Sequence, residues 1–386
     1  MNGPEENRLK TPAFAALSLA FASFGDAFLY AFLPINSNDV GIPVVWVGLL
    51  LSINRFVRIF SNMFIVHLFG KYGLRHLMII AACVAITSTL GYGVASGVLI
   101  WLAFRICWGI SFSVMRIGTL GYALQQKKRG LALGVSKSLQ ETGPMVSLFC
   151  APFLISYFDS DVIFYILALL SVPALYFAWN LPAVKGQTPV RTSRWSIGWP
   201  STLNLITLGS AILIEGILIV VLGILFLNYR ENISLSNATA LAAFYLAYRR
   251  VCAVALSSAG GWLADKFGMD RTFNISIIFI VIGLFGVVSG WIGTGAVLVF
   301  TFYSINAAIA PGSAVSRDDN HSLAAVAENA TWRDIGAATG TLLGGVLISS
   351  QYLNEVLTIG TFVFACLLLI HLGTVRKAAK LFYLWK

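Results

Sequence analysis

The chain contains twelve apolar runs, each about as long as a helix that crosses a lipid bilayer. Such a helix needs about 20 predominantly apolar residues to span a hydrocarbon core about 30 Å thick. The composition agrees, because 58% of the residues are hydrophobic and only 11% are charged, whereas soluble domains carry roughly 25% charged residues. We therefore predict an all-α integral membrane protein of twelve transmembrane helices. The predicted spans are 12–34, 43–69, 77–94, 98–124, 131–155, 162–181, 202–227, 238–263, 272–290, 296–314, 322–349 and 353–372.

Basic residues between the runs gather on one side of the predicted membrane. An excess of Lys and Arg marks cytoplasmic loops, so we expect both termini to be cytoplasmic. The compact loops favour a bacterial inner membrane. The net charge of +10 follows from this bias, and we expect no nucleic-acid partner. The basic residues on the cytoplasmic side are Arg8, Lys10, Lys71, Arg75, Lys127, Lys128, Arg129, Lys185, Arg191, Arg194, Lys266, Arg271, Arg317, Arg376, Lys377, Lys380 and Lys386; Arg230 alone lies on the other side.

The two halves of the chain resemble each other. The stretches 53–56 and 70–73 fall in register with 248–251 and 265–268, and 138–143 matches 331–336. This register pairs Arg55 with Arg250 and Gly73 with Gly268. We predict two six-helix bundles, 1–181 and 201–386, joined by a cytoplasmic linker at 182–200. Duplicated bundles related by an axis along the membrane normal are a transporter architecture, with the site at the repeat interface.

Eight basic residues lie inside the apolar runs. A charge near the middle of a bilayer costs roughly 2.5–3.5 kcal/mol on insertion scales, so such residues face a protein-enclosed or water-filled space. Spans three, six, nine and twelve carry no charge away from their ends, and we expect these four helices to be peripheral. The eight bases are Arg55, Arg58, Arg105, Arg116, Lys137, Arg249, Arg250 and Arg333, and the acids within spans are Asp26, Glu141, Glu215, Glu328 and Asp334.

The excess of bases over acids favours an anionic substrate, since guanidinium groups suit bidentate capture of carboxylate or phosphate. Arg116, deep in the fourth span, is the first candidate for a substrate contact. Arg55 and Arg58 are three residues apart and therefore share one helix face. The predicted substrate-binding residues are Arg55, Arg58, Arg116, Arg249, Arg250 and Asn306.

The intramembrane acids have two possible roles. Asp26 and Glu215 lie in the first helix of each half, where burial and neighbouring bases could tune a carboxyl group to exchange protons; the alternative is a permanent salt bridge. Glu141 is a further candidate for proton coupling and stands four residues after Lys137, so these two could pair on one helix. Glu328, Arg333 and Asp334 could form a similar structural set on the eleventh span.

The run 261–271, Gly-Trp-Leu-Ala-Asp-Lys-Phe-Gly-Met-Asp-Arg, resembles the cytoplasmic loop motif of the major facilitator superfamily. That family uses the loop as a charge latch to helix ends, which implies a gating role for Asp265, Lys266, Gly268 and Arg271. The first-half copy keeps Lys71 and Arg75 but has Gly70 in place of the acid, which implies a weaker or differently partnered latch.

Two other stretches also resemble this family. In 102–109, an Arg precedes a Gly by four residues, like the fourth-span motif that is often linked to proton coupling, and this implies such a role for Arg105. Gly143 and Pro144 resemble the start of the antiporter motif, but Ser147 and Leu148 replace its later glycines. This partial match leaves export and import open.

The expected function is a monomeric secondary transporter, coupled to protons and working by alternating access. No GxxxxGK[ST] sequence occurs, which argues against an ATP-driven mechanism. The sequence also shows no pattern of a nucleophile with a base, so we do not expect an enzyme. The five isolated cysteines predict neither a disulfide framework nor a metal site, and no cofactor is expected. The expected substrate is a small or medium organic anion: a carboxylate, a phosphorylated metabolite or a polycarboxylate metal chelator such as a siderophore. The alternatives are a multidrug or metabolite/proton antiporter, a lipid flippase and a non-transporting receptor.

Overall fold

The computed structural model describes residues 6–184, 199–229, 234–316, 322–347 and 350–384. Over these residues the chain forms helices and turns and contains no strand. Most of the predicted linker, 185–198, lies outside the described residues, so the predicted domain limits stay a prediction.

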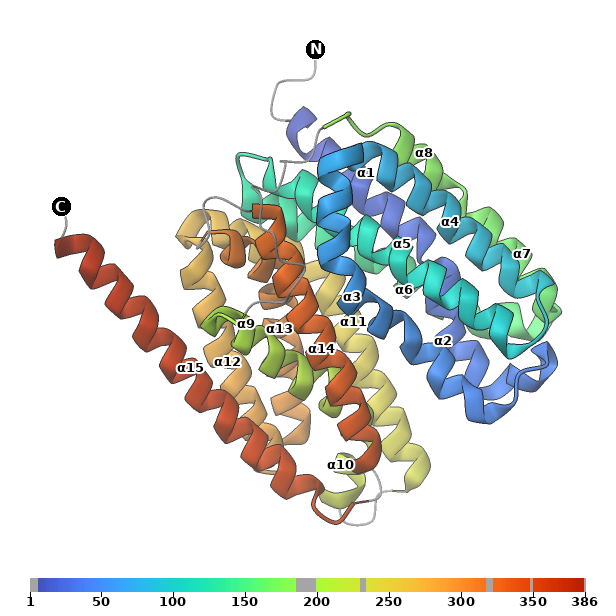
Figure 1. Cartoon of the computed structure of the whole chain (residues 1–386). Helices are drawn as coiled ribbons and strands as arrows, with labels where there is room; N and C mark the ends of the chain where they lie inside the picture. The colour runs from blue at the N-terminus through green and yellow to red at the C-terminus, as the bar shows by residue number, and fades with distance from the viewer. Residues whose placement is uncertain (1–5, 185–198, 230–233, 317–321, 348–349, 385–386) are drawn as a thin grey trace.

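The helices coincide with the twelve predicted runs (Figure 1). Within the described residues, ten helical spans are long and apolar enough to cross a membrane; α6 and α14, which both carry intramembrane charges, are not among them. Three runs are divided: the first at Ser23, the sixth before Pro173, where proline lacks the N–H of a helical interior, and the seventh by a π-helical segment, η3. The helices are α1 Glu6–Ala22, α2 Phe24–Asn36, α3 Val47–Tyr72, α4 Leu74–Val94, α5 Val98–Leu124, α6 Arg129–Tyr157, α7 Ser160–Ser171, α8 Pro173–Trp179, α9 Thr202–Ser210, η3 Ala211–Leu218, α10 Ile219–Tyr229, α11 Leu235–Phe267, α12 Met269–Val288, α13 Ile292–Val315, α14 Ser322–Leu347 and α15 Leu353–Leu384, with short 3₁₀ turns η1 Ser37–Val40 and η2 Val44–Trp46.

Figure 1 shows α1–α8 beside α9–α15. One large cluster of buried apolar side chains belongs to the second half, and two others belong mainly to the first. A smaller cluster, which includes Leu124, Leu133, Val315 and Val326, joins the two halves. The bundle therefore has a core in each half and a shared apolar contact.

The paired glycines of the sequence repeat occupy equivalent places. Gly73 ends α3 with φ 79° and ψ 159°, and Gly268 ends α11 with φ 97° and ψ 138°. A positive φ is a conformation that glycine adopts at little cost. The same backbone turn thus recurs at matching positions of the two halves, as the sequence register predicts.

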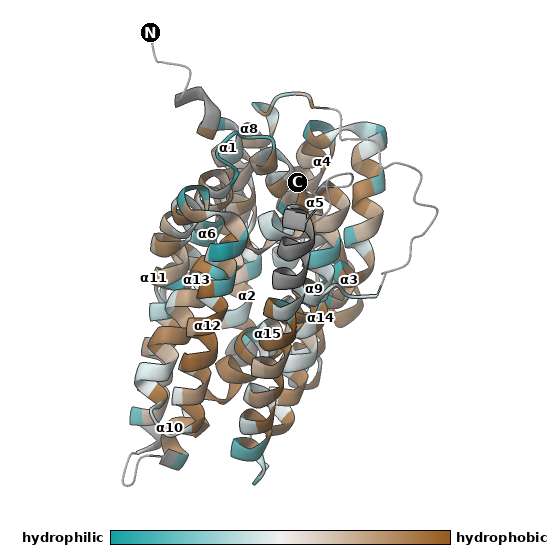
Figure 2. Ribbon diagram, turned by 90° about the vertical axis from the view of Figure 1, so that its left-hand side faces the viewer, coloured by the Kyte–Doolittle hydropathy of each residue, from teal (hydrophilic) through white to brown (hydrophobic). Residues whose placement is uncertain are grey.

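The four helices predicted to be peripheral carry exposed apolar side chains. Examples are Ile80 on α4, Leu169 on α7, Ile282 on α12 and Leu369 on α15. Figure 2 shows α12 and the described part of α15 largely in the colours of hydrophobic residues. Such surfaces suit contact with lipid, which leaves the charged helices to form the interior.

Candidate functional site

A cavity of about 490 Å³ lies between the two halves. This volume is within the range of roughly 300–1,000 Å³ typical of small-molecule sites. Its walls come from α1, α2, α3, α5 and α6 of the first half and from α9, η3, α10, α11, α13 and α14 of the second. Among the residues that the structure describes, none of α4, α7, α8, α12 or α15 lines it, in agreement with their predicted peripheral position.

The cavity wall carries seven basic and four acidic side chains. All six predicted substrate-binding residues are part of it, as are the predicted proton-coupling residues Asp26, Glu141 and Glu215. Arg105 and Glu328 are not. The seven bases are Arg55, Arg58, Arg116, Lys137, Arg249, Arg250 and Arg333, and the four acids are Asp26, Glu141, Glu215 and Asp334.

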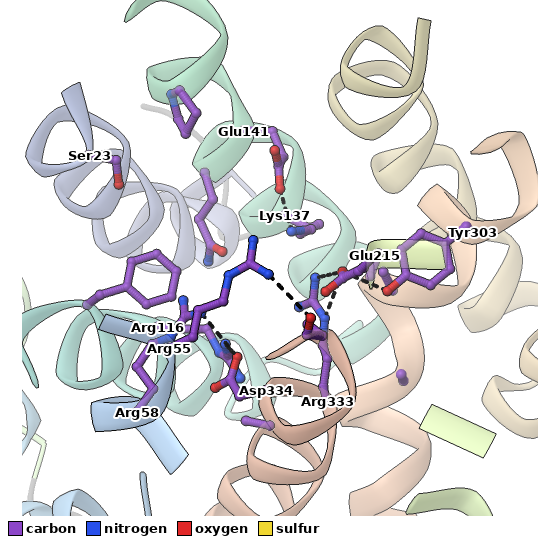
Figure 3. A pocket seen from close by; sticks show the side chains of 18 of the residues that line it. Ser23, Arg55, Arg58, Arg116, Lys137, Glu141, Glu215, Tyr303, Arg333 and Asp334 are labelled. Carbon is purple, nitrogen blue, oxygen red and sulfur yellow. Dashed lines mark hydrogen bonds and ion pairs between the residues drawn. The ribbon is translucent and has the colours of Figure 1, made fainter. Parts of the chain in front are cut away.

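Asp334 of α14 lies between two arginines of the first half (Figure 3). Its Oδ1 is 3.1 Å from Nη1 of Arg116 and 3.5 Å from Nη2 of Arg58. Its Oδ2 accepts a hydrogen bond of 3.2 Å from Nδ2 of Asn62. Only 4% of the carboxylate side chain is exposed, so one buried acid serves two guanidinium groups and holds α14 to α3 and α5.

Arg55 has neutral partners across the same interface. Its Nη1 donates to Oγ1 of Thr341 at 3.0 Å and to the carbonyl of Ala337 at 3.4 Å, both on α14. Among the described residues no carboxylate lies within ion-pair distance of Arg55. Arg55 is a charged neighbour of Arg58. We call Arg55, Arg58, Arg116 and Asp334 the first basic cluster.

Glu141 of α6 is the acid of a second cluster. Its Oε1 is 2.5 Å from Nζ of Lys137, the i, i+4 pair expected from the spacing, and its Oε2 is 2.6 Å from Nη1 of Arg250 on α11. Arg249 has Arg250, Glu215 and Glu141 as charged neighbours, but over the described parts of the chain it has no carboxylate within ion-pair distance. We call Lys137, Arg249, Arg250 and Glu141 the second basic cluster.

The other two acids of the cavity form one-to-one pairs. Asp26 pairs with Arg105, whose Nε also donates to the carbonyl of Leu50 at 2.7 Å. Arg105 is fully buried and lies behind the wall, so its charge marks a helix contact and not the cavity surface. Asp26 also accepts a hydrogen bond from Nδ2 of Asn54 at 3.3 Å.

Glu215 pairs with Arg333 of α14 and accepts a hydrogen bond of 2.6 Å from the hydroxyl of Tyr303 (Figure 3). Glu215 stands in the π-helical η3, and such segments frequently occur at functional sites. The sequence contains no signal that selects Tyr303 from the other aromatic residues, because its role depends on the approach of α13 to η3.

The grouping expected for α14 needs correction. Glu328, Arg333 and Asp334 do not form one set: Glu328 accepts from Nδ2 of Asn204, Arg333 pairs with Glu215, and Asp334 pairs with the first half. Asn306, predicted to bind substrate, lines the cavity, but its Nδ2 donates to Oγ of Ser276 on α12 at 2.9 Å. Its amide therefore already ties α13 to α12.

The two halves contact each other at the end that carries the α3–α4 and α11–α12 turns. Asp265 accepts hydrogen bonds of 2.8 Å from the backbone N–H groups of Gly130 and Leu131, at the start of α6. A carboxylate at a helix N-terminus is favoured by the helix dipole and by the free N–H groups. Gly130 and Gly261 pack so closely that a Cβ on either would strike the backbone of the other.

The first-half turn has no comparable acid. Lys71 lies over the ring of Tyr72 at 5.1 Å, and the Arg75 guanidinium lies 5.6 Å from the ring of Trp179. In the second half, Lys266 lies 5.0 Å from the ring of Trp262, and Arg271 is exposed. Of the predicted gating residues, Asp265 thus makes the contact between the halves.

Besides the charged side chains, the cavity wall includes larger side chains with aromatic or aliphatic surfaces: Tyr30, Leu148, Ile219 and Val220. Tyr30 is 38% exposed and Arg250 has 35% of its side chain exposed. The arrangement can surround a polar molecule with guanidinium groups. Among the described residues no group of three or more His, Cys, Asp or Glu is placed to hold a metal ion.

The sequence profile of the family described as Major Facilitator Superfamily matches residues 15–317. A crystal structure of the human organic anion transporter MFSD10 (TETRAN) superposes with a TM-score of 0.69 at 15% identity, over 95% of this chain and 99% of that one. A bacterial homologue of the iron transporter ferroportin, in an outward-facing state, gives 0.67 at 11% identity, over 94% and 98%. At these identities the two structures establish the fold alone. No curated protein matches the sequence significantly.

Proposed function

Because the chain belongs to the major facilitator superfamily and is a multi-pass membrane transporter, we propose that it carries a small or medium organic anion by proton-coupled alternating access. The candidate substrates are carboxylates, phosphorylated metabolites and polycarboxylate metal chelators. The observation that carries the proposal is the charge of the cavity wall, where seven bases face four acids. The proposal includes a monomer in a bacterial inner membrane with cytoplasmic termini.

The hydrogen-bonding pattern supports an anion. Arg55 and Arg249 have no carboxylate partner among the described residues, and both line the cavity. Arg55 donates to neutral acceptors only, and the acidic neighbours of Arg249, Glu215 and Glu141, lie beyond ion-pair distance. Charge-assisted hydrogen bonds to a carboxylate or phosphate are strong. An anion entering the cavity would give both arginines a charged acceptor at hydrogen-bonding distance.

The same pattern supports a coupling between substrate and conformation. Asp334 links α14 to Arg58 and Arg116, and Glu141 links α6 to Arg250, so both acids join the two halves. A substrate anion that takes these bases competes with the protein carboxylates. Binding would weaken such links and favour rocking of one half against the other, as repeat-built transporters do.

For the coupling ion we propose protons carried by Asp26 and Glu215, with Glu141 as a third candidate. All three carboxylates line the cavity and have basic partners: Arg105, Arg333, and Lys137 with Arg250. Loss of such a partner during the transport cycle raises the proton affinity of the carboxylate. Arg105 would act by holding Asp26, since it does not line the cavity.

The test is a thermal-shift screen of the purified protein against organic anions and cationic drugs, followed by flux of the best ligand into proteoliposomes with and without a pH gradient. A ligand at 100 times its Kd stabilises the folded state by about 2.7 kcal/mol. We expect one anion class to stabilise the wild type, and Arg116→Gln to lose this effect.

Lys128→Gln, a charge removed from the exposed α5–α6 turn, is the matched control and should behave as wild type. Stabilisation by cationic drugs that is indifferent to Arg116 would overturn the anion proposal in favour of a multidrug antiporter. Flux that ignores the pH gradient would overturn the proton coupling alone. A purified protein that binds the anion but moves none of it would indicate a receptor.

A further inference from the structure

The two basic clusters are related by the repeat of the chain. Arg55 of α3 corresponds to Arg250 of α11 in the sequence register, and Glu141 of α6 corresponds to Asp334 of α14. In each cluster, arginines of one of these helices meet an acid from the opposite half: Arg58 meets Asp334, and Arg250 meets Glu141. The repeat therefore places one matched base and one matched acid in each cluster, although Arg58, Lys137 and Arg249 fall opposite Ala253, Ala330 and Asn54 in this register.

Each cluster also has the same excess of charge. In the first, Arg58 and Arg116 contact Asp334, and Arg55 is a charged neighbour of Arg58. In the second, Lys137 and Arg250 contact Glu141, and Arg249 is a charged neighbour of Arg250. Three bases and one acid leave a formal charge of +2 in each cluster. The remaining acids leave this count unchanged, because Asp26 is paired with Arg105, and Glu215, although it is also a charged neighbour of Arg249, is paired with Arg333.

From this duplication we infer that the substrate carries at least two anionic groups at separate positions, one for each basic cluster. The inference rests on the proposed function and narrows its substrate class to dicarboxylates and related polyanions. A monoanion could neutralise part of one cluster only. A dianion would give each half of the protein a counter-charge within one molecule, and would bridge the halves in place of the links through Asp334 and Glu141.

The two arginines without a carboxylate partner are the natural contacts for the two groups. Arg55 is held only by neutral acceptors on α14, and Arg249 has no ion pair among the described residues. They belong to different halves and different clusters. Replacing either one removes a base without leaving a protein carboxylate unpaired, so both positions allow clean tests.

The experiment is isothermal titration calorimetry of the whole purified chain. The probes are unbranched α,ω-dicarboxylates of increasing length, from succinate to sebacate, beside monocarboxylates of the same carbon number. Joining two binding groups raises apparent affinity by roughly 10²–10⁴-fold when the linker spans both sites. We expect one dicarboxylate per protein, an optimum chain length, and affinity roughly 100-fold or more above that of the matched monocarboxylate.

Arg55→Gln and Arg249→Gln should each weaken binding of the best dicarboxylate by roughly 10- to 100-fold, the effect of one hydrogen bond to a charged group. Each variant should still bind a monocarboxylate at the basic cluster that was not mutated. Lys128→Gln is the control and should keep wild-type affinity. Circular dichroism and size-exclusion profiles confirm folding, and the wild-type length series tests the inference without any variant.

Equal affinities for mono- and dicarboxylates, or two dicarboxylates bound per protein, would overturn the two-group inference and leave transport of an organic anion intact. Sensitivity to only one of the two arginine replacements would also overturn it. If no carboxylate binds and the flux assay finds no transported anion, the proposed function falls with the inference.

Discussion

Replacing Asp334 by Asn is the most informative perturbation of the interface between the halves. The substitution keeps the size of the side chain and removes its charge. Arg116 and Arg58 would then lose their shared carboxylate, 3.1 and 3.5 Å away, and the hydrogen bond from Asn62 would lose a charged acceptor. Two guanidinium groups would remain in the bundle interior without a protein counter-charge.

The magnitude follows from burial. The exposed fractions of the side chains are 13% for Arg58, 9% for Arg116 and 4% for Asp334. These ion pairs are therefore buried and differ from surface pairs, which contribute about 0–1 kcal/mol to stability. Removing one partner of a buried pair costs about 3–5 kcal/mol. Because both arginines line a cavity that water can enter, we expect a loss near the lower end, about 3 kcal/mol of unfolding free energy.

The assay is reversible denaturant unfolding in detergent, read by tryptophan fluorescence. Asp161→Asn is the control, since Asp161 is exposed in the first turn of α7 and should cost under about 1 kcal/mol. The double variant Arg116→Gln/Asp334→Asn should recover part of the loss, with a coupling energy of about 0.5–3 kcal/mol. A loss for Asp334→Asn no larger than that of Asp161→Asn, with no coupling to Arg116, would refute the reasoning.

Three further outcomes are expected. Gly261→Ala should leave a folded protein with little flux, because a Cβ would meet the backbone of Gly130 where α6 and α11 touch. Flux equal to wild type would contradict this tight contact. Asp265→Asn removes the charged acceptor at the start of α6 and should weaken the contact between α6 and α11 by about 0.3–1 kcal/mol. The distance distribution between spin labels at Lys127 and Trp262 should then broaden; an unchanged distribution would show that other contacts hold these two helices together. Tyr303→Phe removes the 2.6 Å hydrogen bond to Glu215 and should cost about 1.5–3 kcal/mol in denaturant unfolding, since the acceptor is charged; a neutral result would show that Arg333 alone satisfies that carboxylate.

The fold could be predicted well because its main signals are local. A run of about 20 apolar residues determines a helix by itself. Four runs carry no charge away from their ends, and their helices lie outside the cavity as predicted. The repeat also lies in the sequence, and the matching turns at Gly73 and Gly268 confirm its register. The i, i+4 pair of Lys137 and Glu141 is local in the same sense and is present.

The candidate site was predicted as a set of residues but not as a set of contacts. Arg105 lies in an apolar run like the other bases, yet it is buried behind the wall by Asp26. Asn306 looked free to bind a ligand, yet its amide reaches Ser276 on the next helix. The sequence shows that a charged residue lies within a membrane span, but it does not show which helix packs against that residue.

Arg333 and Asp334 show most clearly where the sequence stops and the tertiary structure decides. As neighbours in the chain they were expected to share one ion-pair set, but successive residues of a helix point about 100° apart. Arg333 therefore reaches Glu215 of η3, and Asp334 reaches Arg58 and Arg116 of the other half. The sequence by itself determined the membrane helices, their duplication and the excess of positive charge. The packing of helices from both halves decided which charges are paired and which face the cavity, because pairing depends on distances across the bundle and not on separation along the chain.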